Sequence, residues 1–102
     1  MEEEELKKYK KLTPLEARTR LLTLDGWKIE NGRLQKEYHF KDFVHAVVFL
    51  NKIVNPIEEN QNYPRMVLTY NRLLVSLFTN AVGALTVMDF DMARAFDQLA
   101  GN

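Results

Sequence analysis

Five side chains in the second half of the sequence combine acids with hydrogen-bonding groups. Glu58 and Asp89 are carboxylates, Tyr63 is a phenol, and Asn62 and Asn80 are carboxamides. Paired carboxylates can exchange protons with a substrate, whereas amides donate and accept hydrogen bonds without titrating. A phenol has an ordinary pKa near 10 and needs neighbouring cations to act as an acid at neutral pH. The set therefore predicts a site that binds a polar ligand better than it moves protons.

The two histidines of the chain stand apart from these five residues. His39 follows Glu37 in an alternating, strand-like run, and His45 lies one turn into a predicted helix. We expect His39 to be a partly exposed strand residue and His45 to lie on a helix surface or interface. Two separated histidines and no cysteine make a zinc site unfavourable, because imidazole and thiolate are its usual ligands. The sequence predicts no metal and no cofactor.

Length and charge narrow the class of protein. At 102 residues and 46% hydrophobic content the chain suits one small domain, which oligomerisation would stabilise. Fourteen basic residues balance fourteen acidic ones, which disfavours nucleic-acid and membrane partners. No apolar run approaches the roughly 20 residues of a membrane span. We expect a cytoplasmic protein with a charged tail over residues 1–11 and a domain over residues 12–102.

Local signals predict an α+β fold. Thr13 and Glu16 form a capping-box pattern around Pro14, Asn31-Gly32 is a hairpin turn signal, and Asp42 and Thr86 are helix caps. The expected elements are a helix over 14–24, strands over 27–29 and 34–40, a helix over 43–54 that ends before Pro56, strands over 65–69 and 72–78, and a helix after Thr86. The order is helix-strand-strand-helix-strand-strand-helix, which predicts a four-stranded antiparallel sheet with the helices packed on one face.

Helical spacing predicts which side chains face the core. In the first helix the inward residues are Leu15, Leu22 and Leu21, and in the last helix they are Met92, Phe96 and Leu99. In the middle helix the expected inward set is Phe43, Ala46, Val47, Leu50, Ile53 and Val54. Val44 and Val48 fall on the opposite side of that helix, in line with Asn51. An uncharged outer face is either a contact between subunits or a pair of stray surface valines.

The spacing of the chemically capable residues resembles that of the pterin-4a-carbinolamine dehydratase family, also called the dimerization cofactor family. Its members usually show Glu, three residues, His-His-Pro, five residues, an aromatic, nine residues, His and then Asp. Here those positions hold Glu58, Asn62, Tyr63, Pro64, Tyr70, Asn80 and Asp89. The likeness runs from Leu12 to Leu99 and also includes Gly26-Trp27, Tyr38 to Phe43, Tyr70-Asn71 and Leu85-Thr86.

The resemblance implies a reaction that the residues do not suit. Family members remove water from a 4a-hydroxytetrahydropterin, which requires a proton delivered to the departing hydroxyl and another taken from a ring nitrogen. Imidazole suits both transfers because its pKa lies near 6.5, but all three family histidines are replaced here. We therefore expect the seven motif positions to form a vestigial pterin pocket with no catalytic residue. The alternative is a dehydratase in which Glu58, Tyr63 or Asp89 handles protons.

The run from Phe78 to Thr86 is similar to that of pterin-dehydratase-like Rubisco assembly factors associated with alpha-carboxysomes. This likeness implies a small chaperone that binds Rubisco large subunits, in association with the carboxysome. A coactivator that stabilises another protein's dimer is a further alternative. Because the family associates through its helices and by extending its sheet, the resemblance also favours a homodimer or homotetramer with Val44, Val48 and Asn51 at the contact.

Overall fold

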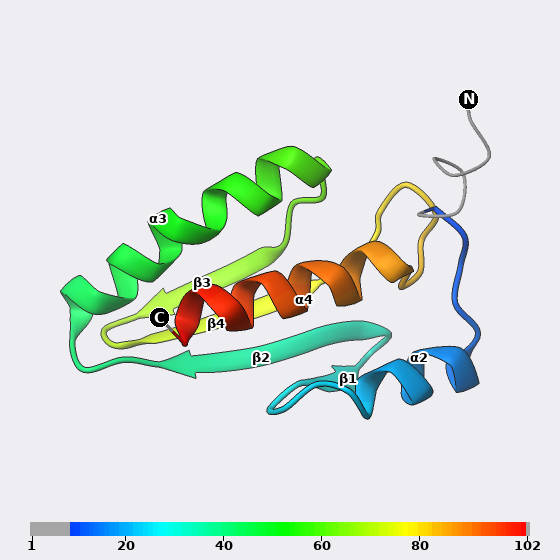
Figure 1. Cartoon of the computed structure of the whole chain (residues 1–102), viewed down its shortest axis with the longest axis horizontal. Coiled ribbons are helices and arrows are strands. Elements are labelled where there is room, and N and C mark those ends of the chain that lie inside the picture. The colour runs from blue at the N-terminus through cyan, green and yellow to red at the C-terminus, as the bar shows by residue number, and fades with distance from the viewer. Residues whose placement is uncertain (1–8, 102) are drawn as a thin grey trace.

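The computed structural model describes residues 9–101, so most of the predicted charged tail lies outside the described residues. The elements, shown in Figure 1, are α2 (Pro14–Leu21), β1 (Lys28–Glu30), β2 (Arg33–His39), α3 (Phe43–Asn60), β3 (Arg65–Thr69), β4 (Arg72–Leu77) and α4 (Val87–Ala100). Their order confirms the predicted α+β class and the helix-strand-strand-helix-strand-strand-helix plan.

One antiparallel sheet runs in the order β1-β2-β4-β3. The β1–β2 hairpin turns at Asn31 and Gly32, which both have positive φ as a tight turn of this kind requires. In the central pair, Leu34 lies opposite Leu77 and Tyr38 lies opposite Leu73. Residues opposite one another point to the same face of a sheet, so these four side chains line one apolar surface.

The helices cover that apolar surface (Figure 1). The side chains of Leu34, Leu73 and Leu77 are fully buried beneath α3 and α4. From the helices, the core receives Phe49, Ile53, Ile57, Met92 and Phe96. The opposite face of the sheet holds mostly polar and charged side chains, which matches the expected one-sided arrangement.

The first helix is shorter and turned differently from the prediction. Thr13 and Glu16 form the expected capping box, with Thr13 N donating to Glu16 Oε1 at 2.9 Å. The helix ends at Leu21, however, and the prediction that Leu15 and Leu22 face the core is wrong: they are 74% and 86% exposed. Ala17 is buried in their place and joins the core, and Leu21, one turn further along, packs partly buried against that core.

The predicted end of the middle helix before Pro56 is also wrong. Helix α3 continues to Asn60 and contains Pro56, and it ends at Gln61, which has a left-handed conformation. A proline inside a helix loses one backbone hydrogen bond and costs about 3 kcal/mol. Ile53 and Ile57 are both buried, one on each side of Pro56, so core packing holds the helix together across the break.

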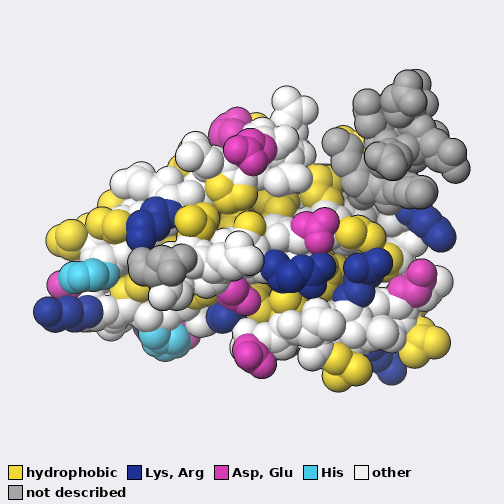
Figure 2. Space-filling view, viewed as in Figure 1, with side chains coloured by type: hydrophobic (Ala, Val, Ile, Leu, Met, Phe, Trp, Pro, Cys, Tyr) yellow, Lys and Arg dark blue, Asp and Glu magenta, His cyan; other side chains and the backbone are white. Residues whose placement is uncertain are grey.

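Within α3 the buried stripe differs from the expected one. Ala46, Phe49, Ile53 and Ile57 face the core, whereas Phe43 and Val54, which we expected to face inward, are exposed. The sheet and α4 cover a narrower sector of α3 than the apolar residues occupy. The uncovered sector is therefore broader than the Val44 and Val48 pair alone. Figure 2 shows hydrophobic side chains along the α3 side of the molecule and again at the edge where α2 lies.

A polar cluster fixes the last turn of α4 to the β1–β2 side. Asp97 accepts hydrogen bonds from Trp27 Nε1 at 3.0 Å, Lys36 Nζ at 2.9 Å and Tyr38 Oη at 2.6 Å. Burial and then the hydrogen bond to Asp97 raise the pKa of Tyr38 far above its ordinary value. The phenol therefore stays neutral and acts as a fixed donor.

Candidate functional site

Four segments bring most of the motif residues together. The end of α3 carries Glu58, the 61–64 loop carries Asn62 and Tyr63, the chain after β4 carries Asn80, and the first turn of α4 carries Asp89. A cavity of about 240 Å³, here called the motif cavity, lies between them and is lined by Tyr9, Gln61, Asn62, Tyr63, Thr79, Asn80, Ala81 and Met88. This volume is below the roughly 300–1,000 Å³ of most small-molecule pockets.

Asp89 is the centre of a buried hydrogen-bond network beside the motif cavity. Its Oδ1 accepts from Asn62 Nδ2 at 2.8 Å, and its Oδ2 accepts from Thr79 Oγ1 at 2.7 Å and from Thr86 N at 3.0 Å. Because the Thr79 hydroxyl points its proton at Asp89, the 2.8 Å contact between the two threonine hydroxyls has Thr86 as its donor. The carboxylate has no exposed surface and does not line the cavity.

The pKa of Asp89 reflects opposing effects. Desolvation is the largest and raises it, while the hydrogen bonds from Thr79, Thr86 and Asn62 lower it and leave a net upward shift. The expected capping role of Asp89 is confirmed by its bond to Thr86 N. The same side chain also ties the 61–64 loop and the end of β4 to the start of α4.

Asn62 is directed into the protein. It is buried, and its amide nitrogen donates to Asp89 and also to Met92 Sδ at 3.4 Å. Both N–H groups of the carboxamide are therefore used by residues of α4. A ligand in the motif cavity could accept from these N–H groups only after those hydrogen bonds were broken.

Tyr63 and Glu58 pair with each other at the rim. The phenol donates to Glu58 Oε2 at 3.0 Å, and this hydrogen bond is the main reason that the pKa of Tyr63 is raised. A raised pKa makes the phenol a weaker acid. Both side chains are exposed, and Glu58 does not line the cavity.

The remaining motif positions are divided. Asn80 is exposed and lines the motif cavity. Pro64 follows Tyr63 and leads into β3. Tyr70 lies in the β3–β4 turn, at the opposite end of a five-residue strand, so it stands roughly 17 Å along the strand from the cavity. The structure thus brings Asn62, Tyr63 and Asn80 to one cavity and leaves Tyr70 out.

Sequence reasoning missed two residues that shape this site. Thr79 supplies a hydrogen bond to Asp89, and Met92 accepts one from Asn62. Thr79 precedes a motif position, so its place beside Asn80 was a usable signal. Met92 sits three residues after Asp89, one helical turn along, and only its apolar packing was expected.

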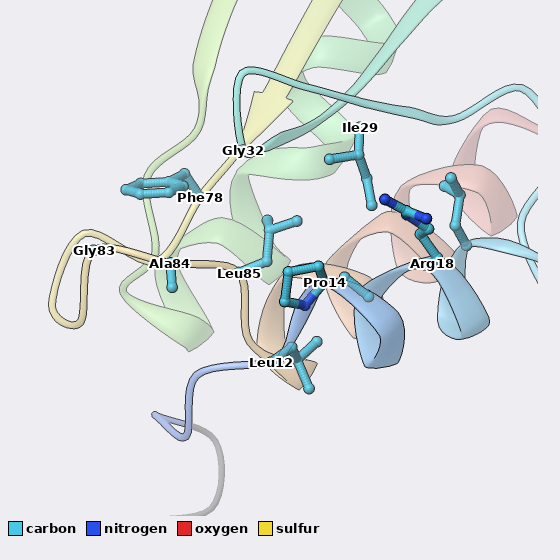
Figure 3. Close-up of a pocket in the computed structure, with 11 residues that line it drawn as sticks. Leu12, Pro14, Arg18, Ile29, Gly32, Phe78, Gly83, Ala84 and Leu85 are labelled. Carbon is cyan, nitrogen blue, oxygen red and sulfur yellow. The ribbon is translucent and has the colours of Figure 1, made fainter.

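A larger concave surface is also lined in part by the 78–85 loop (Figure 3). This cavity of about 620 Å³, here called the α2 groove, lies between α2, the β1–β2 turn and that loop. Its lining residues are Leu12, Pro14, Ala17, Arg18, Leu21, Ile29, Gly32, Phe78, Gly83, Ala84 and Leu85. None of them is a motif position.

Two further findings concern residues 9–101. No three His, Asp or Glu side chains of this part of the chain gather closely enough to hold a metal ion. No helix there has the length and apolar character to cross a membrane.

Val44, Val48 and Asn51 lie on the uncovered side of α3, where the valines are 65% and 47% exposed. Their role in a subunit contact stays a prediction.

Comparison with known proteins gives a consistent set of relatives. The family model described as pterin 4 alpha carbinolamine dehydratase matches residues 10–99. A Nostoc protein with the provisional name pterin-4-alpha-carbinolamine dehydratase is 38% identical over 88 residues, which are 86% of this chain and 95% of that protein.

Two solved structures share the fold. A structure described as transcriptional coactivator/pterin dehydratase from Brucella melitensis has a TM-score of 0.87 and 31% identity, and the match covers 90% of this chain and all of that one. A pterin dehydratase-like protein identified as a RuBisCO assembly factor in the alpha-carboxysome has a TM-score of 0.60 and 19% identity, over 74% of this chain and 88% of that one. The second likeness concerns the fold alone.

Proposed function

Because the chain belongs to the pterin-4a-carbinolamine dehydratase family, we propose that it keeps the family fold and works by binding another protein, without dehydrating a pterin. The observation that carries this proposal is the position of Asn62. Its carboxamide stands at the position of a family histidine, and both of its N–H groups are used within the protein, by Asp89 and Met92.

Proton chemistry supports the same conclusion. No residue that lines the motif cavity titrates near neutral pH in its ordinary state, since the set holds carboxamides, a threonine, apolar side chains and two phenols. The raised pKa of Tyr63 moves that phenol further from use. Each positioned acid or base typically contributes about 10²–10⁴ in rate. Loss of all three imidazoles should therefore leave little dehydration above the uncatalysed rate.

The Rubisco large subunit is the partner that we propose to test first. The similarity of the run 78–86 to the assembly factors and the shared fold with one of them support this choice. This role would have the chain act in the cytoplasm as a homodimer or homotetramer, next to carboxysome assembly. The named partner goes beyond the fold-level likeness and stands as a proposal.

Co-expression tests the partner directly. Tagged chain would be produced together with Rubisco large and small subunits from an organism with alpha-carboxysomes, and assembled Rubisco would be measured on native gels. We expect a higher yield of assembled enzyme and co-purification of large subunits with the tag. Unchanged assembly without co-purified large subunit would remove Rubisco as the partner.

The second candidate function is the family reaction itself. It is favoured by the names of the relatives and by the retained Glu58 and Asp89. Stopped-flow measurement with freshly generated 4a-hydroxytetrahydropterin separates the two. We expect a rate within about tenfold of the uncatalysed reaction, and an acceleration above about 10³ by the unmodified chain would overturn the protein-binding proposal.

A further inference from the structure

Helix α2 exposes two leucines on one line of its surface. Leu15 and Leu22 are the most exposed large apolar side chains among the described residues. They are seven positions apart, which places them above one another on the same side of the helix. Nothing in the hairpin or the core packs over them. Neighbouring exposed apolar side chains of this kind mark interaction sites on soluble proteins.

The α2 groove lies next to these leucines. Its walls are apolar, with Leu12, Leu21, Ile29, Phe78 and Leu85 among the lining residues. Its volume of about 620 Å³ leaves room for apolar side chains from outside.

Arg18 separates the groove from the leucine pair. It is three positions after Leu15 and four before Leu22, so it neighbours both leucines on the helix surface. It is also four positions after Pro14 and three before Leu21, so it neighbours these two groove residues as well. In Figure 3 its side chain extends toward Ile29, and both residues line the groove. No hydrogen bond or ion pair to another described residue occupies its guanidinium group. Across the helix, the apolar leucine pair is therefore followed by the cationic Arg18 and then by the apolar groove.

The segment that contains α2 is basic. Residues 10–22 contain four basic side chains, Lys10, Lys11, Arg18 and Arg20, and one acidic side chain, Glu16, so their net charge is four minus one, or +3. The whole chain has a net charge of zero. Glu16 is already used, since its carboxylate accepts from Thr13 N. The local charge complements an acidic partner.

We infer that the α2 surface, formed by Leu15, Arg18, Leu22 and the α2 groove, docks an amphipathic acidic segment of another protein. Apolar side chains of the segment enter the groove and cover the leucine pair, and a carboxylate between them pairs with Arg18. Helix α2 is eight residues long, or about 12 Å, so a partner segment of about three turns would span it. This inference rests on the proposed protein-binding function and names the surface that performs it.

Selection from a random peptide library tests the surface even while the natural partner is unidentified. Twelve-residue displayed peptides would be selected on the full chain and depleted on the Leu15→Ala/Leu22→Ala variant, whose substitutions lie at exposed positions and keep helix propensity. We expect enriched sequences with leucine or aromatic residues three or four positions apart and a net negative charge. Enrichment of basic or uncharged sequences would overturn the inference. So would peptides that bind the Leu15→Ala/Leu22→Ala variant as well as they bind the full chain.

Fluorescence anisotropy of the best peptide then tests the role of Arg18. Arg18→Gln should weaken binding about fivefold, because a charge-assisted hydrogen bond is lost. Arg20→Gln is the matched control: it removes the same charge from a position on another side of α2 and should change affinity less than twofold. Equal effects of the two substitutions would show general electrostatic attraction and no specific pairing, and would overturn the assignment of Arg18.

Two controls separate this inference from its alternatives. Thermal unfolding should be unchanged in all three variants, since the substituted side chains are exposed or partly exposed. Competition by naphthalene-2-carboxylate as effective as that by the peptide would indicate a small-molecule site and overturn docking of a protein segment. The peptide selection tests the α2 surface alone, whereas the pterin and Rubisco assays test the proposed function. A failed selection would therefore overturn this inference and leave the proposed function to be judged by the other two assays.

Discussion

The motif cavity and the α2 groove are both lined in part by the 78–85 loop and differ in almost every property. The motif cavity is small and polar, and Asn62, which lines it, is already hydrogen-bonded within the protein. The α2 groove is more than twice as large and mostly apolar, and its guanidinium group has no partner among the described residues. The first is lined by three of the motif positions, Asn62, Tyr63 and Asn80, whereas the second has the open apolar walls and the available charge that binding uses.

The contacts of Asp89 give a structural reason for a carboxylate at its motif position. Asp89 keeps its place because it caps α4 and joins three segments, a role that does not require any proton transfer. A retained carboxylate at a motif position is therefore a weak sign of retained catalysis.

The largest expected effect would come from restoring the imidazoles of the motif cavity. The variant Asn62→His/Tyr63→His/Asn80→His should raise the rate of 4a-hydroxytetrahydropterin dehydration by about 10² or more, because it returns titratable groups to the cavity. Arg18→Gln, in the α2 groove, is the control and should leave the rate unchanged. No gain in the histidine variant would mean that cavity shape, in addition to residue type, has been lost.

The next largest effect concerns stability. Asp89→Ala should lower the free energy of unfolding by about 2–4 kcal/mol, because Asn62, Thr79 and Thr86 N lose their acceptor in a buried place. Arg18→Gln should change it by less than about 0.5 kcal/mol. Urea unfolding at neutral pH measures both. A loss below about 1 kcal/mol in the Asp89 variant would contradict a structural role for the network.

The exposed faces of α3 and α2 should differ in self-association. Val44→Glu/Val48→Glu should weaken the expected homo-oligomer at least tenfold, because a subunit contact would bury two unpaired charges. Leu15→Glu/Leu22→Glu places the same charges on the α2 surface and should leave the oligomer intact. Sedimentation velocity at several concentrations distinguishes them. An unchanged mass in the valine variant would dismiss that contact.

The smallest expected effect is a pH dependence of the free energy of unfolding that arises from Asp89, beside the motif cavity. Burial raises the pKa of Asp89 above its unfolded value, so between those two values the native state binds more protons than the unfolded state. The contribution of Asp89 to stability therefore falls as pH rises through this window and is regained on acidification. Urea unfolding of the wild type and of Asp89→Asn at several pH values should show this slope in the wild type alone. Parallel curves would refute it.

Much of the fold followed from short-range signals. The Thr13 capping box, the Asn31-Gly32 turn and the hydrogen bond from Thr86 N to Asp89 at the start of α4 all formed as expected. Each depends on residues within four positions of one another, so sequence neighbours decide its energy. The ends of α2 and α3 were the exceptions: α2 ends at Leu21, before the predicted residue 24, and the burial of Ile57 held α3 together beyond Pro56.

The candidate site was only partly predictable for a related reason. Motif spacing identified the residues near the cavity, yet it also included Tyr70, which the β3–β4 hairpin carries to its far end. Spacing could not show that the Asn62 amide would donate to Asp89, since the two residues lie 27 positions apart in the chain.

The amino-acid sequence by itself determined the order of the elements, their caps and turns, and the replacement of three imidazoles by groups that do not titrate near neutral pH. Tertiary structure alone decided which sides of α2 and α3 stay uncovered and which polar groups are consumed by internal hydrogen bonds. The physical reason is that caps and turns are settled between near neighbours in the chain. Exposure and pairing depend on segments that meet only after folding.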